Sequence, residues 1–319
     1  MANAEIGAFL SSEEHGPRAL VRQAQMAEAA GLRSIFISDH YHPWIDAQGE
    51  SSFVWGVIGA ISSSTSLRVT TGVTCPTVRI HPAVLAQAAA TAQSLLDGRF
   101  VFGVGSGEAL NEHILGHRWP PVATRLDMLE EAVDVIRQLW EGDLVTHHGQ
   151  YYTVENARLY SLPDAPPPVM VSAFGTQASE VAARIGDGLV TVGPNAEVLE
   201  AYRGRGGAGP SITALKVCWD NDEGHARKLV HQLWPTEGLE GQLSQELPLP
   251  SHFEAAAAHV TEEMLAQAVP CGPDPERHVA AITKHLDAGF DQVYVNQIGP
   301  NQEAFFTFFR NEIAPRLGL

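Results

Sequence analysis

Short runs of apolar residues alternate with longer amphipathic stretches along almost the whole chain. The runs are bounded by turn-forming residues, which is typical of strands buried on both faces. We predict eight strands, over residues 4–10, 34–38, 67–74, 100–104, 168–173, 188–192, 212–219 and 292–297. Between these runs, apolar residues recur three or four positions apart, which predicts helices.

The ends of the helical stretches support this alternation. Pro82 stands where one helix would begin and Gly98 just beyond its end. Eight strands, each tied to a helix, predict a parallel sheet closed into a (β/α)8 barrel, with residues 1–319 as one domain. An open, doubly wound sheet is the alternative that the pattern leaves. Two stretches depart from the alternation: a hairpin at about 144–161 and a mostly helical insertion at about 234–271.

Charge narrows the classes of partner. The chain has 20 basic and 37 acidic residues, a net charge of −17, which disfavours nucleic acid and anionic membranes because phosphates need clustered Lys and Arg. No apolar run reaches the length of a membrane span, and the N-terminus lacks a signal-peptide pattern. Three widely spaced cysteines without a CxxC motif argue against disulfides or zinc. We expect a cytoplasmic protein whose partner is a small-molecule substrate.

Polar residues gather at the ends of four predicted strands, where barrel enzymes place their chemistry. The candidates are Asp39, His40 and Trp44 after the second strand, Gly72, Val73 and Cys75 at the third, Ser106, Gly107, Glu108 and Asn111 after the fourth, and Ser172, Ala173, Phe174 and Gly175 at the fifth. The other strand ends show no obvious acid, base or nucleophile.

His40 is the natural proton acceptor, because a neutral imidazole titrates near neutral pH. Glu108 is its natural acid partner, since a carboxyl group in a partly closed pocket can keep its proton. Structural roles stay open at this point. Asp39 and His40 could cap the next element, Glu108 could belong to a glycine-rich turn, and Trp44 could be core.

Two motifs suggest other chemistry but fit it poorly. His40 and His42 form an HxH pair, as in metal-dependent barrel hydrolases, but the later strand ends lack the further ligands, so no metal site is expected. Gly103, Gly105 and Gly107 form GxGxG rather than the dinucleotide fingerprint GxGxxG. These glycines still allow the backbone to approach a ligand closely.

Longer motifs identify a family. SDHYHPW, TGVTCPTVRIHPAVLAQAAAT, RFVFGVGSGEALNE and AARIGDG together resemble the luciferase-like monooxygenase superfamily. More narrowly, they resemble its branch that uses the deazaflavin coenzyme F420, the glucose-6-phosphate dehydrogenase-like group. The resemblance extends over nearly the whole chain, and the combination of SDH-x-x-PW with G-x-G-x-GEALNE is specific, whereas either motif alone is weak.

The resemblance implies an F420-dependent oxidoreductase with the cofactor across the barrel mouth. His40 would take the substrate's hydroxyl proton, Glu108 would protonate the reduced ring, and Trp44 would steady the reacting centre. The implied cofactor contacts are Asp39, Gly72, Val73, Cys75, Ser106, Gly107, Glu108, Asn111 and the backbone of Ser172, Ala173, Phe174 and Gly175. A cis peptide at Gly72-Val73 and a homodimer are also implied.

One departure concerns the substrate. The sugar-phosphate enzymes of this branch hold the phosphate with lysines, and the matching positions here are Asn195 and Ala255. Residues 229–276 contain eight acidic residues and no Lys or Arg. Because a desolvated phosphate needs charged donors, we expect an uncharged substrate rather than glucose-6-phosphate. Arg79 and Arg118 are the residues that could overturn this expectation, although Arg118 could serve the anionic tail of F420 instead.

Three rival functions stay open. The first is an FMN-dependent monooxygenase of the same superfamily. The second is a non-redox barrel hydrolase that pairs Glu108 with Asp39 or Glu112. The third, a non-catalytic binding module, is the weakest because polar residues converge at the strand ends.

Overall fold

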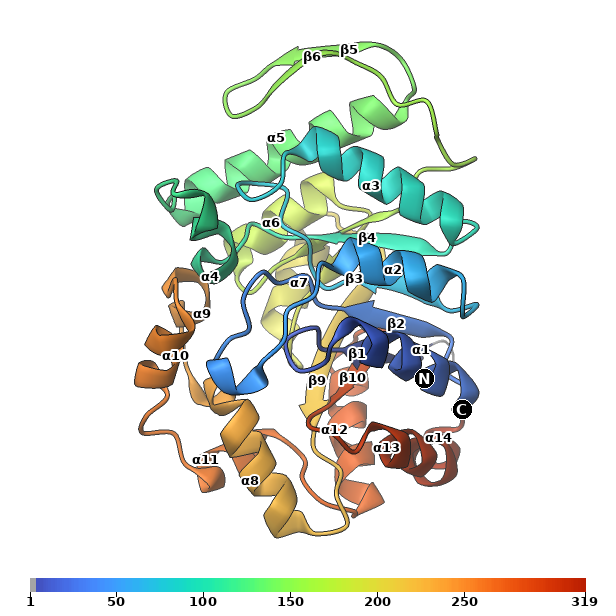
Figure 1. Ribbon diagram of the computed structural model, residues 1–319, viewed down its shortest axis with the longest axis vertical. Coiled ribbons are helices and arrows are strands. Elements are labelled where there is room, and N and C mark those ends of the chain that lie inside the picture. Colours follow the sequence, from blue (N-terminus) through green and yellow to red (C-terminus); the bar gives the residue numbers. More distant parts are fainter. Residues whose placement is uncertain (1–3) are drawn as a thin grey trace.

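Eight parallel strands close into a barrel in the computed structural model, which describes residues 4–319 (Figure 1). The strand order is β1-β10-β9-β8-β7-β4-β3-β2, so the first and last strands of the chain pair with each other. This closure confirms the predicted (β/α)8 barrel and excludes the open sheet. The barrel strands are β1 (Glu5–Leu10), β2 (Ser34–Ile37), β3 (Arg68–Thr71), β4 (Phe100–Val104), β7 (Val169–Ser172), β8 (Gly188–Val190), β9 (Ser211–Val217) and β10 (Gln292–Gln297).

Helices cover the outside of the barrel (Figure 1). The main ones are α1 (Pro17–Ala29), α2 (Val54–Ser62), α3 (Pro82–Leu95), α5 (Val122–Trp140), α6 (Thr176–Ile185), α7 (Ala196–Gly204), α8 (Glu223–Leu233), α12 (Pro275–Asp287) and α13 (Gln302–Phe308). The last helix changes its winding without a break, because α13 passes through a π-helical turn (Phe309–Ile313) into α14 (Ala314–Leu317). Pro315 explains this change, since it has no N–H to donate and its ring crowds the carbonyl four residues earlier.

Side chains along the strands alternate between two cores. The barrel interior is filled by Phe36, Met170, Val190, Ile212, Ala214 and Tyr294. Their strand neighbours, such as Ile35, Ile37 and Leu215, pack outward in the layer beneath the helices. Because the alternation has a period of two, inward positions beyond this interior layer point into the C-terminal mouth of the barrel.

Two segments lie outside the barrel and its surrounding helices. The hairpin, β5 (Val145–His148) and antiparallel β6 (Thr153–Ala157), lies beside α5 at the top of Figure 1. The helical insertion, residues 234–271, lies at the lower left in orange. It comprises a 3-10 turn (Pro235–Gly238), α9 (Leu243–Glu246), α10 (Pro250–Ala256) and α11 (Glu262–Ala268). With α8 it forms a small core of its own around Trp234 and Leu265.

Candidate functional site

The C-terminal ends of the barrel strands surround a cavity of about 700 Å³, a size typical of small-molecule sites. The predicted site residues that line it are Asp39, His40, Trp44, Gly72, Val73, Cys75, Ser106, Gly107, Glu108, Asn111, Ser172, Phe174 and Gly175. Ala173 does not line it. This residue is buried in the outer core, because it alternates with Ser172 and Phe174 along the chain.

The helical insertion forms the opposite wall of this cavity. Its lining residues are Thr236, Glu237, Leu239, Gly241, Gln242, Ser244, Gln245 and Phe253. Buried Arg125, in the first turns of α5, holds this wall in place by donating to Gln245 Oε1 at 3.0 Å and Glu246 Oε1 at 3.1 Å. The insertion is therefore part of the candidate site.

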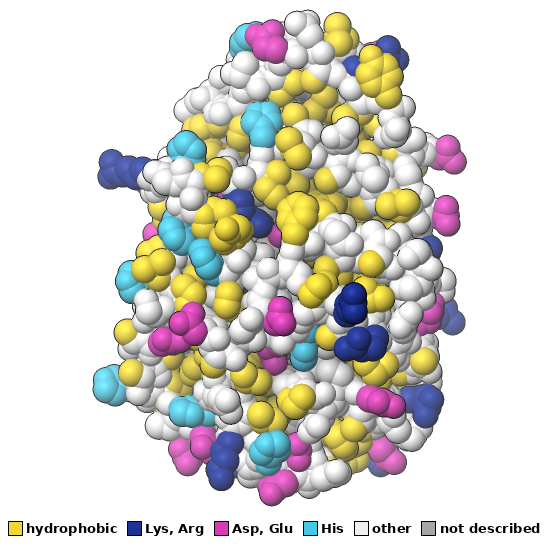
Figure 2. Space-filling view, in the orientation of Figure 1, with side chains coloured by type: hydrophobic (Ala, Val, Ile, Leu, Met, Phe, Trp, Pro, Cys, Tyr) yellow, Lys and Arg dark blue, Asp and Glu magenta, His cyan; other side chains and the backbone are white. Residues whose placement is uncertain are grey.

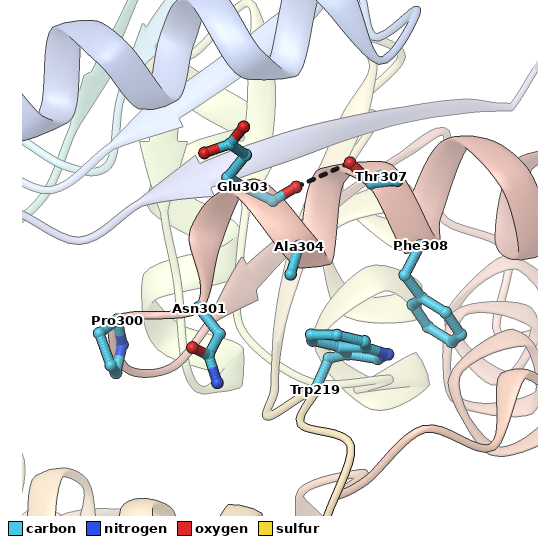
Figure 3. A pocket seen from close by; sticks show the side chains of 7 residues that line it. All are labelled: Trp219, Pro300, Asn301, Glu303, Ala304, Thr307 and Phe308. Carbon is cyan, nitrogen blue, oxygen red and sulfur yellow. Dashed lines mark hydrogen bonds between the residues drawn. The ribbon is translucent and has the colours of Figure 1, made fainter.

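Another pocket, of about 590 Å³, lies between α13 and Trp219, which follows β9 (Figure 3). Asn301 is tied to Asp220 by a hydrogen bond of 2.6 Å, and the Glu303 carboxylate points away from the Trp219 ring. Glu303 is the only titratable side chain among its lining residues. Because this pocket lacks an acid–base pair, the cavity at the barrel mouth is the candidate active site.

His40 lies between two carboxyl groups at the mouth. Its Nε2 is 3.4 Å from Glu13 Oε1 and 3.5 Å from Glu108 Oε2. Its Nδ1 lies 3.2 Å from the carbonyl oxygen of His42, which accepts from a protonated Nδ1, and 3.2 Å from Asn111 Nδ2, which donates to an unprotonated Nδ1. The Trp44 ring packs beside the imidazole, with 5.0 Å between centroids. The geometry thus suits a general base.

The two carboxyl groups beside His40 have opposite pKa shifts. For Glu13, burial acts to raise the pKa, but the interaction with His40 and hydrogen bonds from Ser38 (2.6 Å) and Ser11 (2.8 Å) outweigh it, so the pKa is lowered. For Glu108, burial raises the pKa, and the nearby charge of Glu13 adds to this effect. Carboxyl groups whose surroundings separate their pKa values are typical of acid–base chemistry.

Asn111, in the short helix α4 (Ala109–Glu112), fixes the relative position of these groups. Its Oδ1 accepts from the backbone N–H groups of Tyr41 (2.8 Å) and His42 (3.2 Å). Its Nδ2 donates to Glu108 Oε2 at 3.0 Å. One buried amide therefore joins the loop after β2 to the loop after β4.

Asp39 lines the cavity, but its carboxylate is buried in a hydrogen-bonded network. Its carboxylate accepts from Thr74 Oγ1 at 2.7 Å and from Arg79 at 3.0 Å. Arg79 also lies 3.4 Å from Glu112 Oε1, and burial raises the pKa of Glu112 to about 7. Arg79 is thus already paired with carboxylates, and neither Arg79 nor the exposed Arg118 lines the cavity. Asp39 and Glu112, the two possible second carboxylates of the hydrolase alternative, both pair with Arg79.

Backbone and small side chains form the wall after β3 and β4. The Gly72-Val73 peptide bond is cis, as the resemblance implies. A Cβ atom on Gly105 would lie 2.8 Å from the Val73 side chain, and one on Gly107, whose φ is +91°, would lie 2.6 Å from Cys75 Sγ. Glycine is therefore required at both positions, and the wall stays flat.

The N-terminus of α6 opens onto the cavity. Gly175, Thr176 and Gln177 line the cavity, the N-cap Gly175 offers no side-chain cap, and the first turn contains no acidic residue. The free N–H groups of such a helix end attract anionic groups. This end of the cavity therefore suits a negatively charged part of a ligand.

Two charged residues of the site were missed in the sequence. The prediction that the remaining strand ends carry no acid or base is wrong, because Glu13 follows β1 and Lys216 lies on β9, and both line the cavity. The signal was present in both cases. Glu13 belongs to the polar stretch Ser11–His15 directly after β1, and Lys216 is the one charged residue of β9. Asn195 and Ala255 do not line the cavity, and Asn195 instead caps α7 by accepting from Val198 N.

The cysteines are all free and buried. Burial raises the pKa of Cys75 and Cys218 far above the ordinary value and that of Cys271 to about 11. Each thiol therefore stays protonated near neutral pH, including that of Cys75 on the cavity wall.

Other kinds of site find little support in the part of the chain that the structure describes. Within residues 4–319, no group of three or more His, Cys, Asp or Glu side chains is placed to hold a metal ion. None of the helices over the same residues is long and apolar enough to cross a membrane. On the face shown in Figure 2, Lys and Arg side chains lie singly or in small groups rather than in a continuous stripe.

Comparisons with known proteins identify relatives of the whole chain. The family model described as luciferase-like monooxygenase matches residues 1–292. A protein of Nocardia farcinica named F420-dependent glucose-6-phosphate dehydrogenase is 34% identical, over 99% of both chains, and one of the same name from Nakamurella multipartita is 35% identical, over 98% of this chain and 96% of that one. A solved structure described as an F420-dependent secondary alcohol dehydrogenase with an F420-acetone adduct superposes with a TM-score of 0.89, at 30% identity and 98% coverage of each chain.

A more distant structure shows the shared fold alone. The F420-dependent tetrahydromethanopterin reductase of Methanopyrus kandleri gives a TM-score of 0.76 at 21% identity, with 99% of each chain covered. The family match, the level of identity and the arrangement at the barrel mouth lead to one conclusion: this chain belongs to the luciferase-like monooxygenase family.

Proposed function

We propose that this chain is an oxidoreductase that transfers a hydride between coenzyme F420 and an alcohol, a sugar or a carbonyl compound. The observation that carries the proposal is the position of His40 between Glu13 and Glu108 at the barrel mouth. The chain combines this arrangement with full-length similarity to proteins named as F420-dependent dehydrogenases.

The cavity fits a deazaflavin in two respects. The flat wall of Gly105, Gly107 and Val73 suits an aromatic ring, because no side chain projects from the glycines. The uncapped N-terminus of α6, beginning at Thr176, suits the anionic tail. When bound, F420 supplies the ring carbon that accepts or donates the hydride.

The side chains around the cavity divide the proton transfers between them. His40 Nε2 removes the proton from the substrate hydroxyl as the alcohol is oxidised. Glu13, the carboxyl group with the lowered pKa, stabilises the charge that His40 then carries. Glu108, the carboxyl group with the raised pKa, holds a proton for the cofactor side, and Trp44 orients the imidazole.

An uncharged substrate is part of the proposal. The relatives from Nocardia and Nakamurella are named for glucose-6-phosphate, whereas the solved alcohol dehydrogenase is described with acetone. In this chain Asn195 and Ala255 bring no positive charge, and Arg79 is paired with Asp39. These three facts favour a neutral alcohol, sugar or ketone over a phosphate ester.

The assembly and location are also proposals. We propose a cytoplasmic homodimer, which the resemblance to the F420 branch supports. Analytical ultracentrifugation of the purified chain tests the dimer, and a single monomeric species at micromolar concentration would contradict it.

Cofactor titration is the first test of the function. Adding F420 to the protein should change the cofactor's fluorescence and give saturable binding, whereas FMN and NADP should give none. Tight FMN binding with no response to F420 would favour the rival monooxygenase. Turnover without a redox cofactor would favour the rival hydrolase.

Removal of the proposed base is the second test. His40→Ala should lower turnover by roughly 10²–10⁴-fold, the usual contribution of a positioned general base, and leave F420 binding nearly unchanged. His148→Ala is the matched control, because this histidine is exposed on the hairpin and pairs only with Glu155. Equal activity of the two variants would remove His40 from the mechanism.

A further inference from the structure

Lys216 occupies a position that faces into the barrel mouth. Ile212 and Ala214 of β9 belong to the barrel interior, and Lys216 is the next residue on the same face. The alternation of strand side chains therefore directs it toward the mouth. Among the described residues that line the cavity, Lys216 is the only lysine or arginine.

The ammonium group of Lys216 already has two partners. Its Nζ lies 2.8 Å from Glu237 Oε1 and 4.0 Å from the centroid of the Trp234 ring. The Trp234 indole N–H donates to Glu14 Oε1 at 2.5 Å, which fixes the ring beneath the ammonium group. The Lys216 side chain is only 12% exposed and that of Glu237 29% exposed. Both partners of Lys216 come from the helical insertion.

This pair changes what the cavity can bind. An anionic substrate needs a charged donor when it leaves water, and the charge of Lys216 is already balanced by Glu237. To reach Lys216, an anion would have to displace a carboxylate from a partly buried ion pair. A hydroxyl or carbonyl group has no such requirement, because it can accept or donate a hydrogen bond at the edge of the intact pair.

We propose that Glu237, acting through Lys216, is the specificity-determining residue that excludes anionic substrates from this site. The inference rests on the proposed function, since it concerns the substrate of the same reaction. Glu237 masks the one cationic side chain of the cavity wall, so loss of its charge converts this wall into an anion site.

The test compares matched substrates in two charge-equivalent variants. Glu237→Gln frees Lys216, whereas Glu240→Gln removes one negative charge from an exposed neighbour that does not line the cavity. With saturating F420, kcat/KM is measured for glucose and glucose-6-phosphate, and for 2-pentanol and 3-hydroxybutyrate. The ratio of anionic to neutral substrate should rise about 10-fold or more in Glu237→Gln, as expected for one new charge-assisted hydrogen bond. It should stay within about 2-fold of wild type in Glu240→Gln, because an exposed, screened charge contributes little.

Anion binding provides a readout that does not need turnover. Inorganic phosphate, titrated by calorimetry, should bind Glu237→Gln about 10-fold more tightly than wild type, and the double variant Lys216→Gln/Glu237→Gln should lose this gain. Equal phosphate affinity and equal substrate ratios in Glu237→Gln and Glu240→Gln would overturn the inference. Failure of every variant to reduce F420 with any alcohol would instead overturn the proposed function, while the phosphate titration would still decide the role of Glu237.

Discussion

The hairpin and the helical insertion are both additions to the same barrel, but they differ in what they touch. The hairpin lies beside α5 and contributes none of the residues that line the cavity, whereas the insertion supplies a whole wall of it. The difference follows from where each begins. The insertion starts soon after α8, close to the mouth, whereas the hairpin follows the far end of α5. In this barrel, the position of an added segment relative to the strand ends decides whether it contributes to the ligand cavity.

The contacts that hold the two regions against the barrel differ as well. The insertion is held by buried charged groups, Arg125 under α9 and Glu14 under Trp234. The hairpin is held by Glu131 of α5, which accepts from the backbone N–H groups of Gln150, Tyr151 and Tyr152. Removing a contact that holds the insertion should therefore lower both stability and substrate binding. Removing the contact that holds the hairpin should lower stability alone.

The largest effect is expected at Arg125, whose side chain is fully buried against α9. Arg125→Met should lower the free energy of unfolding by about 2–4 kcal/mol, because it leaves the polar groups around Gln245 and the Pro120 carbonyl without a donor. KM for the alcohol should rise several-fold, since Gln245 lines the cavity. Urea denaturation and steady-state kinetics measure the two effects.

Arg184→Met provides the control for that variant. Arg184 is 55% exposed and pairs with Glu130 on the outside of the barrel, so its loss should change stability by less than about 0.5 kcal/mol. An unchanged KM in Arg125→Met would show that α9 keeps its position without the Arg125 side chain. It would contradict the expectation that contacts of the insertion, unlike those of the hairpin, affect substrate binding.

The next effect concerns pH. Burial raises the pKa of Glu14 to about 7 from its ordinary value of 4.5. Between these values the unfolded chain releases a proton that the folded chain keeps, so the contribution of Glu14 to stability falls as the pH rises, by up to about 3 kcal/mol. Glu14→Gln removes this titration. The free energy of unfolding of the variant, relative to that of wild type, should therefore rise from pH 5 to pH 8. A constant difference across this range would contradict the shift.

The smallest effect is expected in the hairpin, with the opposite pH dependence. For Glu131, burial acts to raise the pKa, but hydrogen bonds from the hairpin backbone and His147 outweigh it, so the pKa is lowered. Its stabilisation is present above the unfolded pKa and is lost as the pH falls through the folded value. Glu131→Gln should cost about 1–2 kcal/mol at pH 7 and little at acid pH, with kcat/KM unchanged. A clear fall in kcat/KM would mean that the hairpin influences the site, for example through the Tyr152 hydroxyl, which donates to the Thr77 carbonyl.

The parts of the molecule that follow one-dimensional periodicity were predictable from the sequence. The strand and helix periods predict the barrel. Because barrel enzymes place their chemistry at the C-terminal ends of the strands, the barrel in turn leads to His40 and Glu108. The contacts among the site residues were not predictable, because they join distant segments. Nothing near Arg79 in the sequence indicates that its partners are Asp39 and Glu112, and nothing in the acidic insertion shows that Glu237 faces Lys216. Glu13 follows β1 as closely as His40 follows β2, so the same rule applied to it, but its contact with His40 forms only when β1 and β2 pair.

The buried thiols have a practical consequence. Maleimides and similar reagents attack thiolates, and Cys75, Cys218 and Cys271 are buried and held protonated, so the native chain should react slowly with them. A single cysteine placed at Tyr160, beyond the hairpin, or at Met264 on the insertion would then be the fast-reacting position, because both side chains are exposed. Environment-sensitive dyes attached at these two positions could report separately on the two additions as a ligand enters the barrel.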